Sequence, residues 1–157
     1  MELMIVMVIM SILSAIVIGN LGTTTKRGRD NRRKSDLRNI QTALETYFND
    51  KGTYPASSLG VMMGCGVGDS QVCTWGDSAG FKDSNGTIYM IQLPKDPVSG
   101  RTYYYVSTGT SYKIYAKMEN TLDTGEGVLS TGYSGTNCST SGSVLCTYGV
   151  SSSNTKP

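Results

Sequence analysis

Four cysteines are the residues whose type and spacing most directly suggest chemistry. They form two pairs, each enclosing seven residues: Cys65 with Cys73, and Cys138 with Cys146. The chain has no histidine, which rules out mixed Cys/His zinc sites and favours an even-numbered disulfide set. Three connectivities are open, and we favour the two local bridges because Gly, Ser and Thr occupy the short intervals. Each bridge would stabilise the fold by about 2 to 3 kcal/mol.

Motifs that carry catalysis are missing from the rest of the sequence. There is no GxSxG, no phosphate-binding Walker loop, no CxxC and no pair of carboxylates in an apolar setting. Asp96 lies in a KDP segment, where aspartate is typical of a turn rather than of a catalytic acid. We therefore expect neither enzymatic activity nor an organic cofactor, and we expect the cysteines to be structural.

A single carboxylate precedes a long apolar segment at the start of the sequence. Glu2 is followed by Leu3 to Ile18, in which Ser11 and Ser14 are the polar residues. A carboxylate on a helix that prefers hydrocarbon costs a few kcal/mol wherever it is buried, so it needs a specific role. The plain alternative places Glu2 at the level of the lipid headgroups.

The apolar segment predicts a helix that packs against copies of itself. Its 16 residues span about 24 Å, which is less than the ~30 Å hydrocarbon thickness of a bilayer. Ser11, Ala15 and Gly19 follow at four-residue spacing, which lets membrane helices approach closely. A signal peptide is disfavoured because no Lys or Arg precedes the apolar run, and a buried core helix would need a larger domain. A helix that only anchors the chain in the membrane gives Glu2 no role. We therefore favour a membrane anchor that also assembles with other copies of itself.

A basic cluster follows the apolar segment and accounts for the net charge of +2. We expect a solvated helix face or a collar that contacts lipid headgroups, with DNA binding as a weaker alternative. The positive-inside rule would place this cluster in the cytoplasm, whereas disulfides form in oxidising compartments. We follow the cysteines and expect the domain outside the cytoplasmic membrane. The cluster comprises Lys26, Arg27, Arg29, Arg32, Arg33 and Lys34.

Periodicity predicts the elements that position these residues. Gly19 to Gly28 holds three glycines and three consecutive threonines, so we expect a weak or melted joint there. An amphipathic helix is then predicted over 34–50, and Gly52 and Pro55 end it. Its apolar positions recur with helical spacing at Leu37, Ile40, Leu44, Tyr47 and Phe48.

Strand signals follow at 87–93, 101–107 and 111–118, and the last two predict a hairpin. Residues 51–86 and 119–157 are expected to form loops tied by the cysteines. In the strand over 111–118, Tyr112, Ile114, Ala116 and Met118 share a face that we expect to cover the helix, and Lys113, Tyr115 and Lys117 share the solvent face.

These elements predict an α+β fold. A long N-terminal helix, apolar in its first half and amphipathic in its second, would pack on a small antiparallel sheet with disulfide-tied loops. We expect residues 1–25 to form the hydrophobic segment and its joint, and residues 26–157 to form one globular domain.

The N-terminal half of the sequence combines Glu2, the run LMIVMVIMSILSAIV, a following GNL, a basic stretch and LETYFNDKGTYP. This pattern resembles that of the type IV pilin superfamily. The stretch LPKDPVSGRTYYYVSTGTSYKIYAKMEN further resembles the sheet of the subgroup that includes the type II secretion major pseudopilin. Family chains usually begin with a methylated Phe four residues before the glutamate, whereas Met1 alone precedes Glu2 here. Ser11 stands where the family often has Gly, and Gly19 where it usually has Pro.

The resemblance implies a subunit that is held in the cytoplasmic membrane, processed by a prepilin peptidase and extracted by inner-membrane assembly machinery into a helical homopolymer. It also implies that Glu2 pairs with the N-terminal amine of a neighbouring subunit, here on Met1, which would offset the desolvation of the carboxylate as subunits dock. In the pseudopilin branch a loop after the sheet binds calcium, and Asp123 and Glu126 would be the oxygen ligands here.

From these observations we expect the major structural subunit of a type IV pilus, a cell-surface filament used in adhesion, motility or DNA uptake. The alternative is the major pseudopilin of a type II secretion system, and a second alternative is a membrane-anchored binding module that uses the basic cluster.

Overall fold

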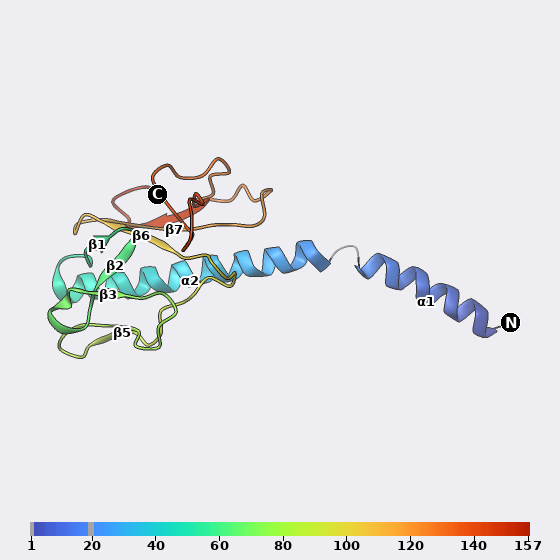
Figure 1. Cartoon of the computed structure of the whole chain (residues 1–157), viewed down its shortest axis with the longest axis horizontal. Coiled ribbons are helices and arrows are strands. Elements are labelled where there is room, and N and C mark those ends of the chain that lie inside the picture. The colour runs from blue at the N-terminus through green and yellow to red at the C-terminus, as the bar shows by residue number, and fades with distance from the viewer. Residues whose placement is uncertain (1, 19–20) are drawn as a thin grey trace.

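The computed structural model describes residues 2–18 and 21–157. Two helices begin the chain, α1 (Glu2–Ile18) and α2 (Leu21–Lys51) (Figure 1). We expected the helix to be interrupted over Gly19 to Gly28. The structure gives two helices, but residues 21–28 belong to α2, so the predicted joint was too long. Gly19 itself lies outside the described residues.

The helix α2 is exposed in its first turns and packed further along. Residues 22–28 are exposed, whereas Arg29 is half-buried and donates to Glu119. Further along, the predicted apolar stripe is buried, with Leu37 and Leu44 fully enclosed. The helix ends at Lys51, and the N–H of Gly52, at φ 72°, donates to the carbonyl of Phe48 at 2.7 Å. This left-handed glycine is the C-terminal cap that the sequence indicated.

Three small antiparallel sheets surround α2. The first has the order β1-β2-β3, with β1 (Ser57–Ser58), β2 (Val61–Cys65) and β3 (Gln71–Cys73), and a short 3-10 turn η1 (Val67–Asp69) joins the last two strands. The second pairs β4 (Phe81–Lys82) with β5 (Ile88–Met90). The third has the order β6-β7-β8, with β6 (Tyr104–Ser107), β7 (Tyr112–Ala116) and β8 (Tyr148–Ser151). These elements make the predicted α+β fold.

The predicted hairpin is present as β6 and β7, with Tyr105 opposite Ile114. The strand expected over 87–93 is reduced to β5, which pairs with β4 in a sheet separate from the hairpin. A strand that the sequence analysis did not predict, β8, pairs with the other edge of β7 and places Tyr148 opposite Ala116. The C-terminal region, which we expected to form loops, therefore also contributes a strand to the main sheet.

The core lies between α2 and the sheets, and the alternation of β7 assigns its faces. Tyr112, Ile114, Ala116 and Met118 are buried toward the helix, as predicted. The opposite face differs from the expectation, because Tyr115 is buried there and packs against Tyr133. The segment that carries the second disulfide covers this face, so a second small core forms on the side expected to meet solvent.

Candidate assembly site

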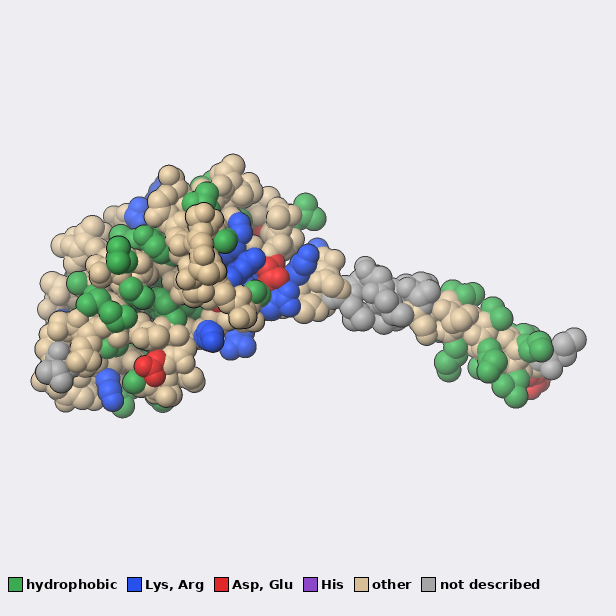
Figure 2. Space-filling model, viewed as in Figure 1, with side chains coloured by type: hydrophobic (Ala, Val, Ile, Leu, Met, Phe, Trp, Pro, Cys, Tyr) green, Lys and Arg blue, Asp and Glu red, His purple; other side chains and the backbone are tan. Residues whose placement is uncertain are grey.

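The helix α1 presents a continuous apolar surface. Ten large apolar side chains between Leu3 and Leu13 are each at least half exposed, and Figure 2 shows them along the helix. The hydroxyls of Ser11 and Ser14 donate to the carbonyls of Val8 and Met10, both at 2.8 Å, so neither hydroxyl requires a partner outside the helix. A surface of this kind marks a site for lipid or for another protein surface.

Two of the predicted assembly residues, Glu2 and Ser11, have described side chains on this helix. Glu2 occupies the first turn of α1 and is exposed. Ser11 lies on the helix surface, whereas the side chain of Ala15 and the whole of Met1 and Gly19 lie outside the described residues. The small-residue stripe therefore stays a prediction.

A buried guanidinium joins α2 to the remainder of the domain. Arg33 has no exposed surface, and its Nε and Nη2 donate to the two carboxylate oxygens of Asp96 at 2.7 and 2.8 Å. Its Nη1 donates to Asp30 at 2.7 Å and to Glu119 at 2.9 Å. Burial lowers the pKa of Arg33, but the hydrogen bonds to Asp96 and Glu119 outweigh burial and raise the pKa overall. The guanidinium stays charged and donates four hydrogen bonds to three carboxylates.

Asp30 and Glu119 extend this network. Asp30 also accepts the backbone N–H groups of Glu119 and of Asn120, the latter at 2.8 Å, which fixes the chain after β7 against α2. Arg29 donates to both oxygens of Glu119 at 2.8 and 2.6 Å. The hydrogen bonds from Arg29, followed by those from Arg33, lower the pKa of Glu119 to about 2.

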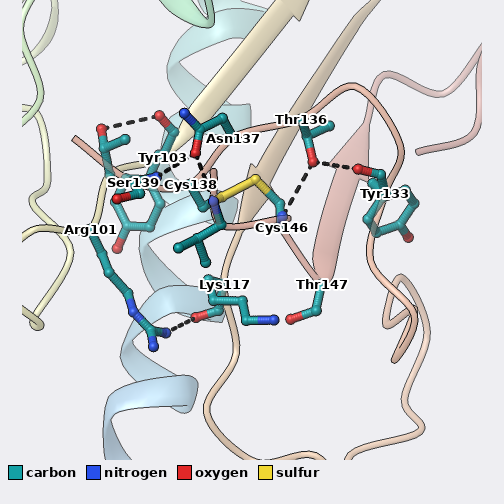
Figure 3. Close-up of a disulfide and its surroundings, with 12 residues drawn as sticks. Arg101, Tyr103, Lys117, Tyr133, Thr136, Asn137, Cys138, Ser139, Cys146 and Thr147 are labelled. Carbon is teal, nitrogen blue, oxygen red and sulfur yellow. Dashed lines mark hydrogen bonds between the residues drawn. A yellow bond between two sulfur atoms is a disulfide. The ribbon is translucent and has the colours of Figure 1, made fainter. Parts of the chain in front are cut away.

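Two disulfides tie the loops, Cys65 with Cys73 and Cys138 with Cys146. This is the pairing that the sequence analysis favoured. Figure 3 shows the second bridge, whose cysteines are fully buried. The Thr136 hydroxyl donates to the carbonyl of Tyr133 at 2.7 Å and accepts the N–H of Cys146 at 3.3 Å, so the bridge lies in an ordered segment.

Comparison with known proteins identifies the family. Residues 20–130 match the family described as type II secretion system (T2SS), protein G. The type II secretion system core protein G of Pseudomonas aeruginosa is 31% identical over 111 residues, which is 69% of this chain and 71% of the relative. This chain belongs to the type II secretion system protein G family.

Two further relatives carry the same description. The core protein G of Vibrio cholerae is 28% identical over 108 residues, or 69% of this chain and 68% of the relative. That of Aeromonas hydrophila is 28% identical over 116 residues, or 72% and 73% of the two chains. No solved structure matches the chain.

Membership of the protein G family corrects the principal functional expectation. The sequence analysis favoured a type IV pilus subunit on the cell surface, with roles in adhesion, motility or DNA uptake, and this was wrong. The matched family and its relatives are type II secretion proteins. The resemblance to pilins and to the pseudopilin subgroup is confirmed, and the alternative that the sequence analysis kept fits the findings better.

Only part of the basic cluster forms the solvated helix face that we expected. Lys26, Arg27 and the side chain of Arg32, which is 64% exposed, do meet solvent. In contrast, Arg33 is enclosed and Arg29 is engaged by Glu119. The carboxylates that neutralise these cations come from distant parts of the chain, which the local sequence does not reveal. This arrangement also removes the basis for DNA binding through a continuous basic face.

Of the two calcium ligands that the sequence analysis suggested, Asp123 is engaged by other groups. Asp123 accepts from the Lys34 ammonium at 2.6 Å, and its other oxygen accepts the N–H of Gly125 at 2.9 Å. The hydrogen bond from Lys34 is the main cause of the lowered pKa of Asp123. Glu126 is exposed, and within the described residues no group of three or more His, Cys, Asp or Glu side chains could hold a metal ion.

The sequence analysis missed the carboxylates at the centre of the site. Asp96 does accept the N–H of Val98 at 2.8 Å in a turn, as expected, but it is also the bidentate partner of Arg33. The signal that could have revealed a network is Asp30, an acid inside a basic run and three residues before Arg33.

None of the helices over residues 2–18 and 21–51 combines the length and apolarity needed to cross a membrane.

Proposed function

We propose that this chain is the major pseudopilin of a type II secretion system. In this role it is a structural, non-catalytic subunit that is held at the cytoplasmic membrane with its domain outside. It then polymerises through α1 into a short helical filament that drives protein export. Processing by a prepilin peptidase and extraction by the inner-membrane assembly machinery belong to the same proposal. Family membership supports it, since the relatives are named as core proteins of that secretion system.

The observation that carries the proposal is the exposed apolar surface of α1. Each exposed large side chain from Leu3 to Leu13 would gain about 1.5 to 3 kcal/mol if it were fully buried. A hydrocarbon layer can cover this surface in the free subunit, and neighbouring copies of α1 can cover it in a filament. A domain that carries its own core, as this one does, has no need of such a helix for folding.

Glu2 would set the register of the polymer. Its exposed carboxylate stands at the tip of an apolar helix, where packing against other copies would strip away water. Pairing with the amine of Met1 in the next subunit would restore favourable interactions when that subunit docks. Ser11, Ala15 and Gly19 would form the face along which the helices approach. Residues 1–25 would thus build the filament core, and residues 26–157 would coat it.

The test is replacement of Glu2 by alanine in cells whose secretion system relies on this chain. We expect export of the secreted protein to fall at least tenfold and filaments to be lost. The domain should still form both disulfides, since the four cysteines lie in the domain and Glu2 lies on α1. Glu126→Ala, another exposed carboxylate, is the matched control and should leave export unchanged. Normal export and filaments from Glu2→Ala would refute the proposed role of α1.

A further inference from the structure

A cavity opens at the end of the domain from which α2 runs toward α1. It has a volume of about 300 Å³, and Lys and Arg side chains gather over this end of the molecule in Figure 2. Four separate segments build it: the start of α2, the turn before β6, the chain after β7 and the residue before β8. Its polar lining includes Lys26, Arg101, Lys117, Thr121, Ser130 and Thr147.

The three cations of this cavity are not neutralised. Across residues 2–18 and 21–157, no carboxylate lies within 4.0 Å of the charged nitrogens of Lys26, Arg101 or Lys117. The two carboxylates in the wall have other partners, since Glu119 is engaged by arginines and Asp123 by Lys34. The cavity therefore has an excess of positive charge, although acidic residues line it.

Arg101 and Lys117 are held next to each other despite their like charges. The Nη1 of Arg101 donates to the backbone carbonyl of Lys117 at 3.3 Å, which anchors the guanidinium and leaves its other N–H groups available (Figure 3). Burial, and then the charge of Arg101, lower the pKa of Lys117. A bound anion would offset this lowering of the pKa, because its negative charge favours the protonated form of Lys117.

Hydroxyl groups complete the donor set. Thr147 accepts the N–H of Met118 at 2.9 Å through its Oγ1, which leaves its O–H free to donate into the cavity. Thr121 and Ser130, in the chain after β7, add two further hydroxyls to the lining. Cations together with O–H donors around a compact hollow suit a group with several oxygen acceptors, and the fork of arginine suits phosphate in particular.

We propose that this cavity binds a phosphate group, and that in the cell this group is the headgroup phosphate of an anionic phospholipid. The assignment of this phosphate to a lipid headgroup rests on the proposed function, in which α1 enters the membrane and brings this end of the domain to the headgroups. Lys26 lies on the exposed first turns of α2, which lead directly to α1, so the cavity is at the membrane side of the domain. Headgroup binding would orient the free subunit before assembly.

The first experiment tests the phosphate site without lipid. The full chain, ¹⁵N-labelled and held in a neutral detergent, is titrated with inorganic phosphate, and amide shifts at Lys117 and Thr121 are followed. We expect saturable shifts in these amides, and Lys117→Gln should weaken binding at least fivefold. Lys113→Gln removes a lysine of β7 that does not line the cavity, and it should stay within twofold of the parent chain. Absence of saturable shifts, or equal effects of the two variants, would overturn the proposal.

The second experiment distinguishes the lipid from free phosphate. The same chain is placed in nanodiscs of phosphatidylcholine alone or with phosphatidylglycerol, so that α1 has a bilayer in both. We expect the shifts at Lys117 and Thr121 in the anionic nanodiscs only, and not in Lys117→Gln. Phosphate binding in detergent with no difference between the nanodiscs would overturn the lipid assignment. Loss of filaments in Lys117→Gln with phosphate affinity unchanged would assign the cavity to a contact between subunits and overturn the proposal.

Failure of these experiments is separable from failure of the proposed function. Glu2→Ala should abolish export and leave the phosphate shifts intact, because Glu2 is not part of the cavity. Conversely, an absent phosphate site would leave polymerisation through α1 untouched.

Discussion

Arg33 and Asp96 form a bidentate ion pair with no exposed side-chain surface on either partner, and 63 residues of chain separate them. Asp30 and Glu119 contact the same guanidinium, so one side chain of α2 connects the turn before β6 and the chain after β7. The pair holds the domain on the helix just below the exposed turns that lead to α1. In the proposed filament, any load passing between α1 and the domain would cross this junction.

Replacing Arg33 with alanine should destabilise the domain by about 3 to 5 kcal/mol, because three carboxylates would lose a shared cation and Asp96 would be left buried and unpaired. Urea unfolding followed by circular dichroism measures this. Arg32→Ala is the matched control: its side chain is 64% exposed and its contact with Asp36 is 4.0 Å long, so the change should stay within about 0.5 kcal/mol. Equal effects of the two variants would contradict the role given to Arg33.

Glu119 should make the domain sensitive to acid. Its pKa is lowered from 4.5 in the unfolded chain to about 2 in the folded protein. The stability from this carboxylate is therefore fully present above pH 4.5 and is lost as the pH falls toward 2. After allowance for solvent screening we expect a contribution of about 2 kcal/mol. Glu119→Gln should lower the free energy of unfolding by that amount at pH 7 and by much less near pH 2.

The measurement is urea unfolding at a series of pH values between 2 and 7. Glu126→Gln serves as control, since this residue is exposed on the same loop region. If the stability gap between the parent chain and Glu119→Gln stays constant over this range, the carboxylate of Glu119 is not the source of the acid sensitivity.

Local patterns in the sequence predicted local structure well. The helical spacing from Leu37 to Phe48 placed the buried stripe of α2, and the alternation over 111–118 placed the β6–β7 hairpin and its helix-facing side. These features depend on neighbours within a few residues, which a sequence pattern records directly.

Two of the features that the sequence analysis missed depend on long-range pairing. The strand β8 spans four residues in a region rich in Gly and Ser, and it is defined by its pairing with β7 about 35 residues earlier. The basic cluster was misread for the same reason, because Asp96 and Glu119 lie far from Arg33 in the chain. Charge patterning shows where cations are, but it does not show which carboxylates the fold brings to them.

Gly80 should be intolerant of a side chain. Its φ is +69°, and a Cβ would meet the backbone carbonyl oxygens of Met90 and Ile91. Gly86 provides the control, because it has a similar φ of +85° and open space around the added atom. Both alanine variants share the strain of a left-handed backbone, so the difference between their stabilities reports the steric clash at residue 80 alone. We expect Gly80→Ala to be about 2 kcal/mol less stable than Gly86→Ala in thermal or urea unfolding. Equal stabilities would show that the β4–β5 sheet can shift to make room.

The C-terminal region should be essential for folding, although the family match ends at residue 130. Thr147 supplies a hydroxyl to the N–H of Met118 and a backbone N–H to the carbonyl of Ala116, both at 2.9 Å, and Ser152 accepts the N–H of Tyr112. Removal of residues 131–157 would leave these buried groups of the main sheet unpaired and would uncover Tyr115. A chain ending at residue 130 should therefore lose cooperative thermal unfolding.

Removal of residues 153–157 alone is the matched control for that truncation. It deletes surface contacts such as the hydrogen bond from Asn154 to the carbonyl of Thr110 and leaves β8 complete. This shorter truncation should cost about 1 kcal/mol and keep a single cooperative transition. Differential scanning calorimetry distinguishes the two results. The contrary result is cooperative unfolding of the chain ending at residue 130 at the same temperature as the control. In that case β8 is an addition to an already complete sheet, and the second disulfide serves a purpose other than holding that strand in place.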